Sequence, residues 1–131
     1  TGQFVLEFIG PDAFPRVTSI GASLLGQIMT LNPDLDVLLI GHVTKDRLVV
    51  NGQVEVGTGG AVYYGSIPLR RLGLKTAVVT RLHPADAHLL DGMKAEGVQV
   101  FAVPAAETVE MENIYPTADQ ERRICRAIGF A

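Results

Sequence analysis

A pair of glycines, Gly59-Gly60, separates a run that is predicted to be a β-strand, Gln53–Val56, from a run that is predicted to be a helix ending at Leu72-Gly73. Glycines at a strand-to-helix junction leave the backbone bare, so a ligand can approach it closely. The junction also places free backbone N–H groups at the N-terminus of the helix, where polar or anionic ligand atoms are favoured. The pair therefore predicts an α/β fold with a ligand at the turn.

Apolar runs of strand length predict a buried sheet. Val37–Val43 is a continuous apolar run, which is typical of a strand buried on both faces of a parallel sheet, and Thr76–Thr80 and Val98–Val103 are two more predicted strands. Between the first two of these strands, Asn51-Gly52 follows Arg47–Val50 and precedes Gln53–Val56. Asn-Gly between two such runs indicates a β-hairpin, because both turn positions need φ > 0.

The remaining elements complete an α/β pattern. In the hairpin, Val54 and Val56 alternate with polar residues, which predicts one wet face. Helices are predicted over Gly60–Leu72 and Pro84–Glu96, each followed by a glycine stop, with Pro68 as an irregularity in the first. Thr108–Tyr115 alternates as a half-exposed strand, and Thr117 is a candidate cap for a last helix. The order predicts a mostly parallel sheet with flanking helices and a small separate β layer.

Composition narrows the class of protein. The 131 residues are 47% hydrophobic and 19% charged, which indicates a single globular domain. A net charge of −3 with scattered signs argues against a nucleic-acid partner. No apolar run reaches the roughly 18–20 residues of a membrane helix, so no membrane partner is expected. Cys125 is the single cysteine, which excludes an internal disulfide and predicts a cytoplasmic protein.

Several site motifs fail on spacing. A dinucleotide fingerprint would place a third glycine where Val62 stands, and Lys75-Thr76 lacks the glycine of a phosphate-binding P-loop. The three histidines do not have the spacing of a metal site, so no metal is expected. Asp46 follows the first buried strand, where open α/β sheets place ligand groups, and a carboxylate can accept two sugar hydroxyls. From position alone, a capping aspartate at the start of the hairpin explains Asp46 equally well.

The order and spacing of these segments resemble the N-terminal part of the ribokinase-like (PfkB) carbohydrate kinases, over about residues 36–128. No single segment is diagnostic. The segments are Ile40-Gly41-His42-Val43-Thr44-Lys45-Asp46, the hairpin, Thr58-Gly59-Gly60, Arg70-Arg71-Leu72-Gly73-Leu74, Ala77-Val78-Val79-Thr80, Glu96-Gly97-Val98 and Thr108 with Glu112-Asn113-Ile114-Tyr115.

This resemblance implies that the fold is part of a ribokinase-like three-layer sandwich. It also implies that the full-length enzyme transfers a phosphoryl group from ATP, with Mg²⁺, to a hydroxyl group of a sugar, polyol or nucleoside. It implies that Asp46, Gly59 and Gly60 contact the substrate. It also implies a β lid formed by about residues 47–56 and 108–115, which covers the substrate and supports a homodimer. We count Tyr64, on the predicted helix, and Glu110, on the second lid segment, among the candidate substrate contacts.

The chain departs from the family pattern at several positions. Thr44 stands where many sugar-binding members carry Asn, and Tyr64 stands where ribokinases place a sugar-binding Asn, so a substrate other than ribose is expected. Arg81-Leu82-His83-Pro84-Ala85-Asp86 replaces the family's Val-Gly-x-Asp. The Gly-Ala-Gly-Asp motif, whose Asp is the family's catalytic base, does not occur in these residues, and neither does the ATP site.

One domain organisation and two alternative functions follow. Residues 1–35 are expected to be an N-terminal extension, and residues 36–131 the N-terminal substrate and lid portion of a ribokinase-like domain whose C-terminal half is missing. We expect a kinase fragment that has no catalytic residue of its own and is inactive alone. The alternative is a non-enzymatic α/β binding or dimerisation module that uses exposed lid strands.

Overall fold

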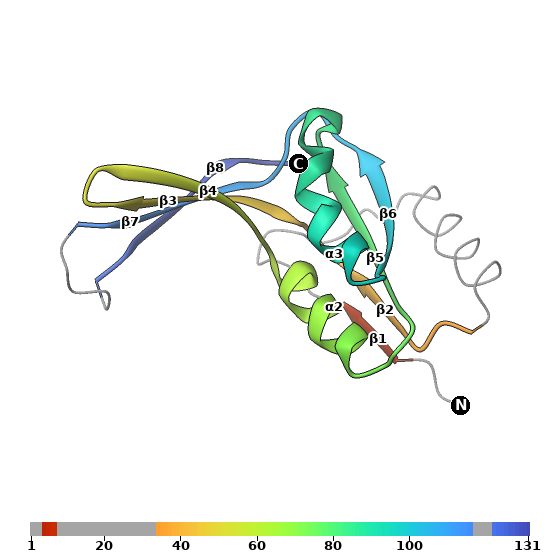
Figure 1. Cartoon of the computed structure of the whole chain (residues 1–131). Coiled ribbons are helices and arrows are strands. Elements are labelled where there is room, and N and C mark those ends of the chain that lie inside the picture. Colours follow the sequence, from red (N-terminus) through yellow and green to blue (C-terminus); the bar gives the residue numbers. More distant parts are fainter. Residues whose placement is uncertain (1–3, 8–33, 117–121) are drawn as a thin grey trace.

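The computed structural model of the chain describes residues 4–7, 34–116 and 122–131, which form a body and an arm that projects from it (Figure 1). The body contains a four-stranded parallel sheet of order β1-β2-β5-β6, and the arm is a second four-stranded sheet of order β4-β3-β7-β8, here called the lid sheet. The body strands are β1 Phe4–Glu7, β2 Val37–Ile40, β5 Thr76–Leu82 and β6 Gln99–Pro104. The lid strands are β3 Thr44–Val50, β4 Gln53–Gly59, β7 Glu110–Tyr115 and β8 Ile124–Gly129. The predicted α/β class with a separate β layer is confirmed.

Helices cover one face of the body sheet in Figure 1: α2 Ala61–Arg71, the 3₁₀ helix η1 Pro84–Leu90 and α3 Asp91–Ala95. Their apolar side chains pack on alternate residues of β2 and β5 and form the main core, because successive strand residues point to opposite faces. Its fully buried members include Leu39, Val62, Val78 and Met93. Leu38 and Ala77 point to the other face of the sheet and belong to a second buried cluster. β2 and the Ala77–Val79 part of β5 therefore bury apolar side chains on both faces, as expected for strands of a covered parallel sheet.

The lid sheet has two distinct faces, which its registers define. Asp46 pairs with Gly57 on β4 and Met111 on β7, and these residues share what we call the Asp46 face. The neighbouring residue Lys45 pairs with Thr58 and Glu110 on the opposite side, the Lys45 face. The Asp46 face also carries Thr44, Leu48, Gly59 and Asn113, and the Lys45 face also carries Arg47, Val49, Val54, Val56, Glu112, Ile114, Ile124 and Arg126.

Hydrogen bonds hold the chain near the points where it crosses between the body and the lid. The Val43 N–H donates to the buried Thr80 Oγ1 at 2.9 Å, and the Lys45 N–H donates to the Val109 carbonyl at 2.9 Å. The Ala105 N–H donates to the Leu82 carbonyl at 3.0 Å. The lid therefore leaves the body through hydrogen-bonded crossings, which fix the base of the arm.

The hairpin is confirmed, and it is longer than predicted. Asn51 and Gly52 have φ of 51° and 76°, as the turn requires. The prediction of a single wet face is wrong: Val54 and Val56 are 49% and 53% exposed, because no part of the described chain covers this side of β4.

Besides the longer hairpin, three elements differ from the prediction by more than two residues or in type. The strand predicted over Val37–Val43 ends at Ile40, and the following residues cross to the lid. The segment Pro84–Glu96, predicted as one helix, is a 3₁₀ helix that ends at Leu90 and a short α-helix that begins at Asp91. Residues 117–121, with the predicted cap Thr117, lie outside the described residues, and Ile124–Gly129 is a strand where a last helix was predicted.

At the N-terminal side, β1 pairs in parallel with β2, so Phe4–Glu7 extends the body sheet. Residues 8–33 lie outside the described residues, and the assignment of residues 1–35 to an extension stays a prediction. Among the described residues, no helix has the length and apolar character needed to cross a membrane.

Candidate functional site

The carboxylate of Asp46 lies directly over Gly59, on the Asp46 face at the base of the lid. Thr44, the register partner of Gly59, donates its hydroxyl to Asp46 Oδ1 at 2.7 Å. A Cβ built on Gly59 would lie 2.1 Å from Asp46 Oδ2 and 2.7 Å from Thr44 Oγ1. The absence of a side chain at Gly59 is therefore what lets Asp46 take this position, while Thr44 orients the carboxylate.

Gly60 forms the sharp turn from β4 into α2. Its φ of 99° and ψ of 147° are a conformation that is essentially restricted to glycine. A Cβ at Gly60 would lie 2.3 Å from the His42 carbonyl oxygen, which is backbone and cannot move aside easily. No side chain caps the N-terminus of α2 at Gly60.

Tyr64 stands on the first turn of α2, beside β4. Its side chain is 64% exposed, and its phenol donates a long hydrogen bond of 3.4 Å to the Thr58 carbonyl. The ring meets that of Tyr63 edge to face at a centroid distance of 5.5 Å. Tyr64 therefore offers an exposed aromatic face and one hydroxyl next to the Gly59-Gly60 turn. Its predicted role in substrate binding stays a prediction.

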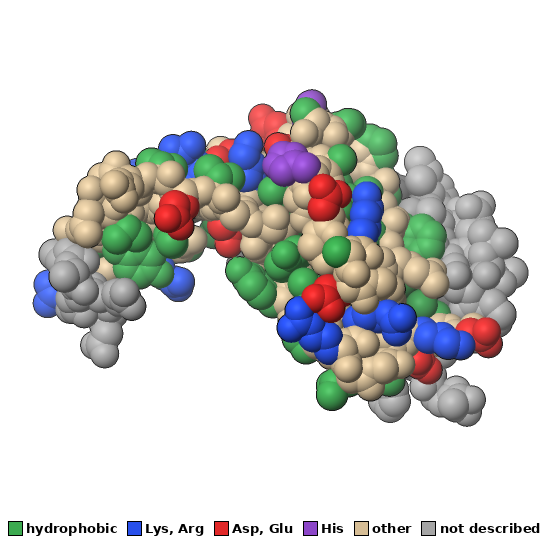
Figure 2. Space-filling view, in the orientation of Figure 1, with side chains coloured by type: hydrophobic (Ala, Val, Ile, Leu, Met, Phe, Trp, Pro, Cys, Tyr) green, Lys and Arg blue, Asp and Glu red, His purple; other side chains and the backbone are tan. Residues whose placement is uncertain are grey.

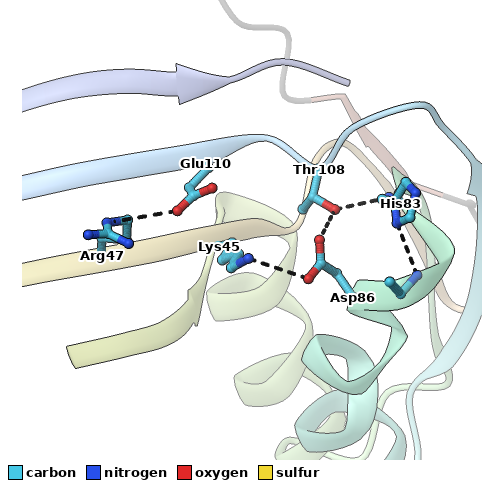
Figure 3. Close-up of polar contacts among 7 residues, drawn as sticks. Lys45, Arg47, His83, Asp86, Thr108 and Glu110 are labelled. Carbon is cyan, nitrogen blue, oxygen red and sulfur yellow. Dashed lines mark hydrogen bonds and ion pairs between the residues drawn. The ribbon is translucent and has the colours of Figure 1, made fainter. Parts of the chain in front are cut away.

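Glu110 lies on the opposite face of the lid from Asp46. It is the register partner of Lys45, and its carboxylate is 3.9 Å from Arg47 Nε (Figure 3). The structure thus brings together Asp46, Gly59 and Gly60, with Tyr64 nearby, and places Glu110 apart from them. A role for Glu110 as a substrate contact stays a prediction that its position does not favour.

The surface is hollowed between the lid sheet and the body (Figure 2). The hollow is bordered by the segment in which β4 runs into α2, the segment that contains Gly59 and Gly60 (Figure 1). In the described residues, no group of three His, Cys, Asp or Glu side chains is arranged to hold a metal ion. The arrangement can accept hydrogen bonds from a polar ligand through the carboxylate of Asp46.

A polar cluster at the base of the lid had no counterpart in the sequence analysis. Asp86, on η1, accepts a hydrogen bond from the Thr108 hydroxyl at 2.7 Å and lies 3.6 Å from Lys45 Nζ (Figure 3). The hydrogen bond from Thr108, with a smaller contribution from the charge of Lys45, lowers the pKa of the Asp86 carboxyl. Only the unusual segment Arg81–Asp86 marked this region, and no spacing rule links Asp86 to residues 22 and 41 positions away.

Similar solved structures are kinases. A pyrophosphate-dependent kinase of the ribokinase family, solved with sulfate, is 35% identical, with a TM-score of 0.62 over 70% of this chain and 32% of its own. A pyrophosphate-dependent kinase of that family, solved with a pyrophosphate analog and myo-inositol, is 34% identical, with a TM-score of 0.61 over 70% of this chain and 31% of its own. A PfkB protein from Polaromonas sp. JS666 is 27% identical, with a TM-score of 0.59 over 71% of this chain and 34% of its own.

The likeness covers only part of these proteins, since the chain spans about a third of their length. No family model matches the chain, and no curated protein does. The predicted resemblance is confirmed by the solved structures, together with the prediction that the fold is partial.

Proposed function

We propose, for a chain that has the fold of part of a ribokinase (PfkB) family kinase, that it forms the substrate and lid portion of an enzyme that phosphorylates a hydroxyl group of a small polyol, sugar or nucleoside. The observation that carries the proposal is the Asp46 carboxylate held over Gly59 at the base of the lid. A myo-inositol-like polyol is the first candidate substrate, because one of the similar kinases was solved with myo-inositol.

The chemistry of Asp46 suits a polyol. A carboxylate accepts hydrogen bonds on both oxygens, and Oδ1 already accepts one from Thr44. Adjacent hydroxyls of a polyol can donate to the remaining acceptor positions, and hydrogen bonds to a charged group are the stronger kind. Tyr64 would add a hydroxyl and an aromatic face against which the carbon ring of a polyol can lie.

A lid over the polyol has a physical purpose in phosphoryl transfer. Excluding water prevents transfer of the phosphoryl group to water and strengthens the electrostatic contacts of the reaction. We expect the donor to be ATP or pyrophosphate: the sequence resemblance implied ATP with Mg²⁺, whereas two similar kinases are named as pyrophosphate-dependent. The described residues offer no metal cluster and the sequence no Gly-Ala-Gly-Asp motif, so we expect these residues alone to transfer no phosphoryl group.

Titration calorimetry with myo-inositol tests the proposal. We expect Asp46→Asn to weaken binding by roughly 10- to 100-fold, the effect of losing a hydrogen bond to a charged group. Glu112→Gln is the matched control, because it makes the same change on the opposite face of the lid, and should alter binding less than about twofold. Fructose and inosine in parallel distinguish a sugar or nucleoside site from a polyol site. Absence of binding to all three ligands, or equal losses in the two variants, would contradict the proposal.

A second candidate function is dimerisation through the lid. On the Lys45 face, register partners form an apolar row across all four strands, consisting of Val54, Val49, Ile114 and Ile124. Val54 and Ile124 are 49% and 53% exposed, and apolar surface of this kind favours a partner. Light scattering should show a homodimer that Val54→Lys dissociates; a monomer at all concentrations would exclude it. A cytoplasmic location and the lack of a nucleic-acid partner stay predictions.

A further inference from the structure

Asp86 connects the body to both inner strands of the lid. It lies on η1, in the body, and its two carboxylate oxygens face different lid segments (Figure 3). Oδ2 accepts the hydrogen bond from Thr108, which precedes β7, and Oδ1 is 3.6 Å from Nζ of Lys45 on β3. Because β3 and β7 are adjacent parallel strands, one side chain of the body contacts both near the ends at which they begin.

Thr108 completes this connection because its hydroxyl is used twice. It accepts the His83 N–H at 2.9 Å and donates to Asp86 at 2.7 Å. The direction is fixed, since a backbone N–H can only donate and a carboxylate can only accept. Thr108 is only 6% exposed, so water does not replace these partners easily. The Thr108 hydroxyl thereby joins three segments by hydrogen bonds: the end of β5, η1 and the residues before β7.

The connection and the candidate site lie on opposite faces of the lid sheet. Lys45 and Asp46 are consecutive in β3, so their side chains project to opposite faces of the lid. A contact that fixes Lys45 from one side therefore also fixes the backbone from which Asp46 reaches over Gly59 on the other. The three residues Asp86, Thr108 and Lys45 are here called the lid clamp. The atoms nearest to a Cβ built on Gly59 belong to Asp46 and Thr44 and not to the clamp.

We infer that Asp86 is a positioning residue for the polyol site: it holds the ends at which β3 and β7 begin against the body and so sets where the Asp46 carboxylate lies. The inference rests on the proposed function in so far as Asp46 is the polyol contact. The positions of the strands and of Asp46 can nevertheless be measured without any ligand.

Amide hydrogen exchange and NMR chemical shifts of the chain test the clamp. In Asp86→Asn, we expect the Lys45 amide, which donates to the Val109 carbonyl, to exchange about tenfold faster, and the Gly59 resonance to shift. Thr108→Val should do the same by removing the hydroxyl, and Thr108→Ser should restore the wild-type values. Glu96→Gln is the matched control: it makes a carboxyl-to-amide change at an ion pair with Arg71, away from the lid, and should leave both measurements unchanged.

The outcomes separate the clamp from general stability and from the proposed function. The inference is overturned if the Lys45 amide keeps its rate within about twofold in both variants, if the amide of Val78 in the body core accelerates by the same factor, or if the Gly59 resonance stays in place. If the wild type binds no myo-inositol while these shifts occur as expected, the proposed function fails and the clamp stands. If myo-inositol binds equally to wild type and Asp86→Asn, the positioning role is overturned.

Discussion

The body and the lid are both four-stranded sheets, but they are stabilised differently. Every residue of Thr76–Thr80 in the body is buried, whereas no residue of Glu110–Tyr115 in the lid is. The body buries apolar side chains on both faces of its sheet, as a stable layered domain requires. The lid strands pair along their length, with one irregularity in the β7–β8 register, but they bury little apolar surface among the described residues. Such a sheet is expected to open at a lower free energy than the body, as the proposed role of a substrate lid requires.

A core truncation in the body should give the largest effect and sharpen this contrast. Leu39 is 1% exposed and packs in the main core, so Leu39→Ala should lower the free energy of unfolding by about 2–5 kcal/mol. The paired change in the lid is Val56→Ala, at a residue that is 53% exposed, and it should cost less than about 0.5 kcal/mol. Thermal melts followed by circular dichroism measure both variants under one set of conditions.

Comparable losses in Leu39→Ala and Val56→Ala would break the contrast. They would mean that Val56 is covered in solution, as the dimerisation proposal requires. Repeating the melt of Val56→Ala over a range of protein concentrations separates the two cases, because the stability of a dimer depends on concentration.

The junction between the two regions gives the next largest expected effect. Gly60→Ala would place a Cβ 2.3 Å from the His42 carbonyl oxygen, in a backbone conformation that other residues avoid. We expect a loss of roughly 1–3 kcal/mol from backbone strain alone. Gly57→Ala is the control, because a Cβ there meets nothing within 4 Å, and it should change the melt by less than about 0.5 kcal/mol. Equal melting temperatures for the two variants would show that the turn relaxes without cost.

The sequence predicted the body better than the lid because buried strands leave apolar runs that can be recognised in the sequence. Continuous apolar runs identified β2, β5 and β6, and Asn51-Gly52 identified the hairpin through its turn chemistry. The pairing of β3 with β7 joins residues about 65 positions apart, as Lys45 and Glu110 show, and no local pattern specifies such a pair. The lid as one four-stranded sheet therefore came from the structure, although its segments were predicted.

The candidate site was predicted in part for the same reason. Asp46 and Gly59 lie on adjacent strands of one hairpin, so their proximity follows from a local turn. The face on which Glu110 lies depends on the register between β3 and β7, and a shift of one residue would reverse it. Asp86 was missed because its partners, Lys45 and Thr108, are brought to it by the crossings between the body and the lid.

Acid should destabilise the base of the lid before it destabilises the body. This is the smallest effect that we expect from the difference between the two sheets. The hydrogen bond from Thr108 and the charge of Lys45 lower the pKa of Asp86 in the folded chain. The charge of His88, on η1 itself, contributes in the same direction. In the unfolded chain, Asp86 has the ordinary pKa of about 3.9. Above that pH the ionised carboxylate stabilises the fold, and this contribution is lost as the pH falls through the lower, folded value.

The Lys45 amide reports this loss locally. Below about pH 4, its protection relative to that of Val78 should fall in the wild type, after correction for the intrinsic pH dependence of exchange. In Asp86→Asn the relative protection should be lower already at neutral pH and should respond less to acid, because no carboxyl remains to take up a proton. Parallel acid profiles in the two proteins would assign the change to groups other than Asp86. An acid dependence of Lys45 protection that is present in the wild type and absent in Asp86→Asn would identify this carboxylate as the group through which the body holds the lid.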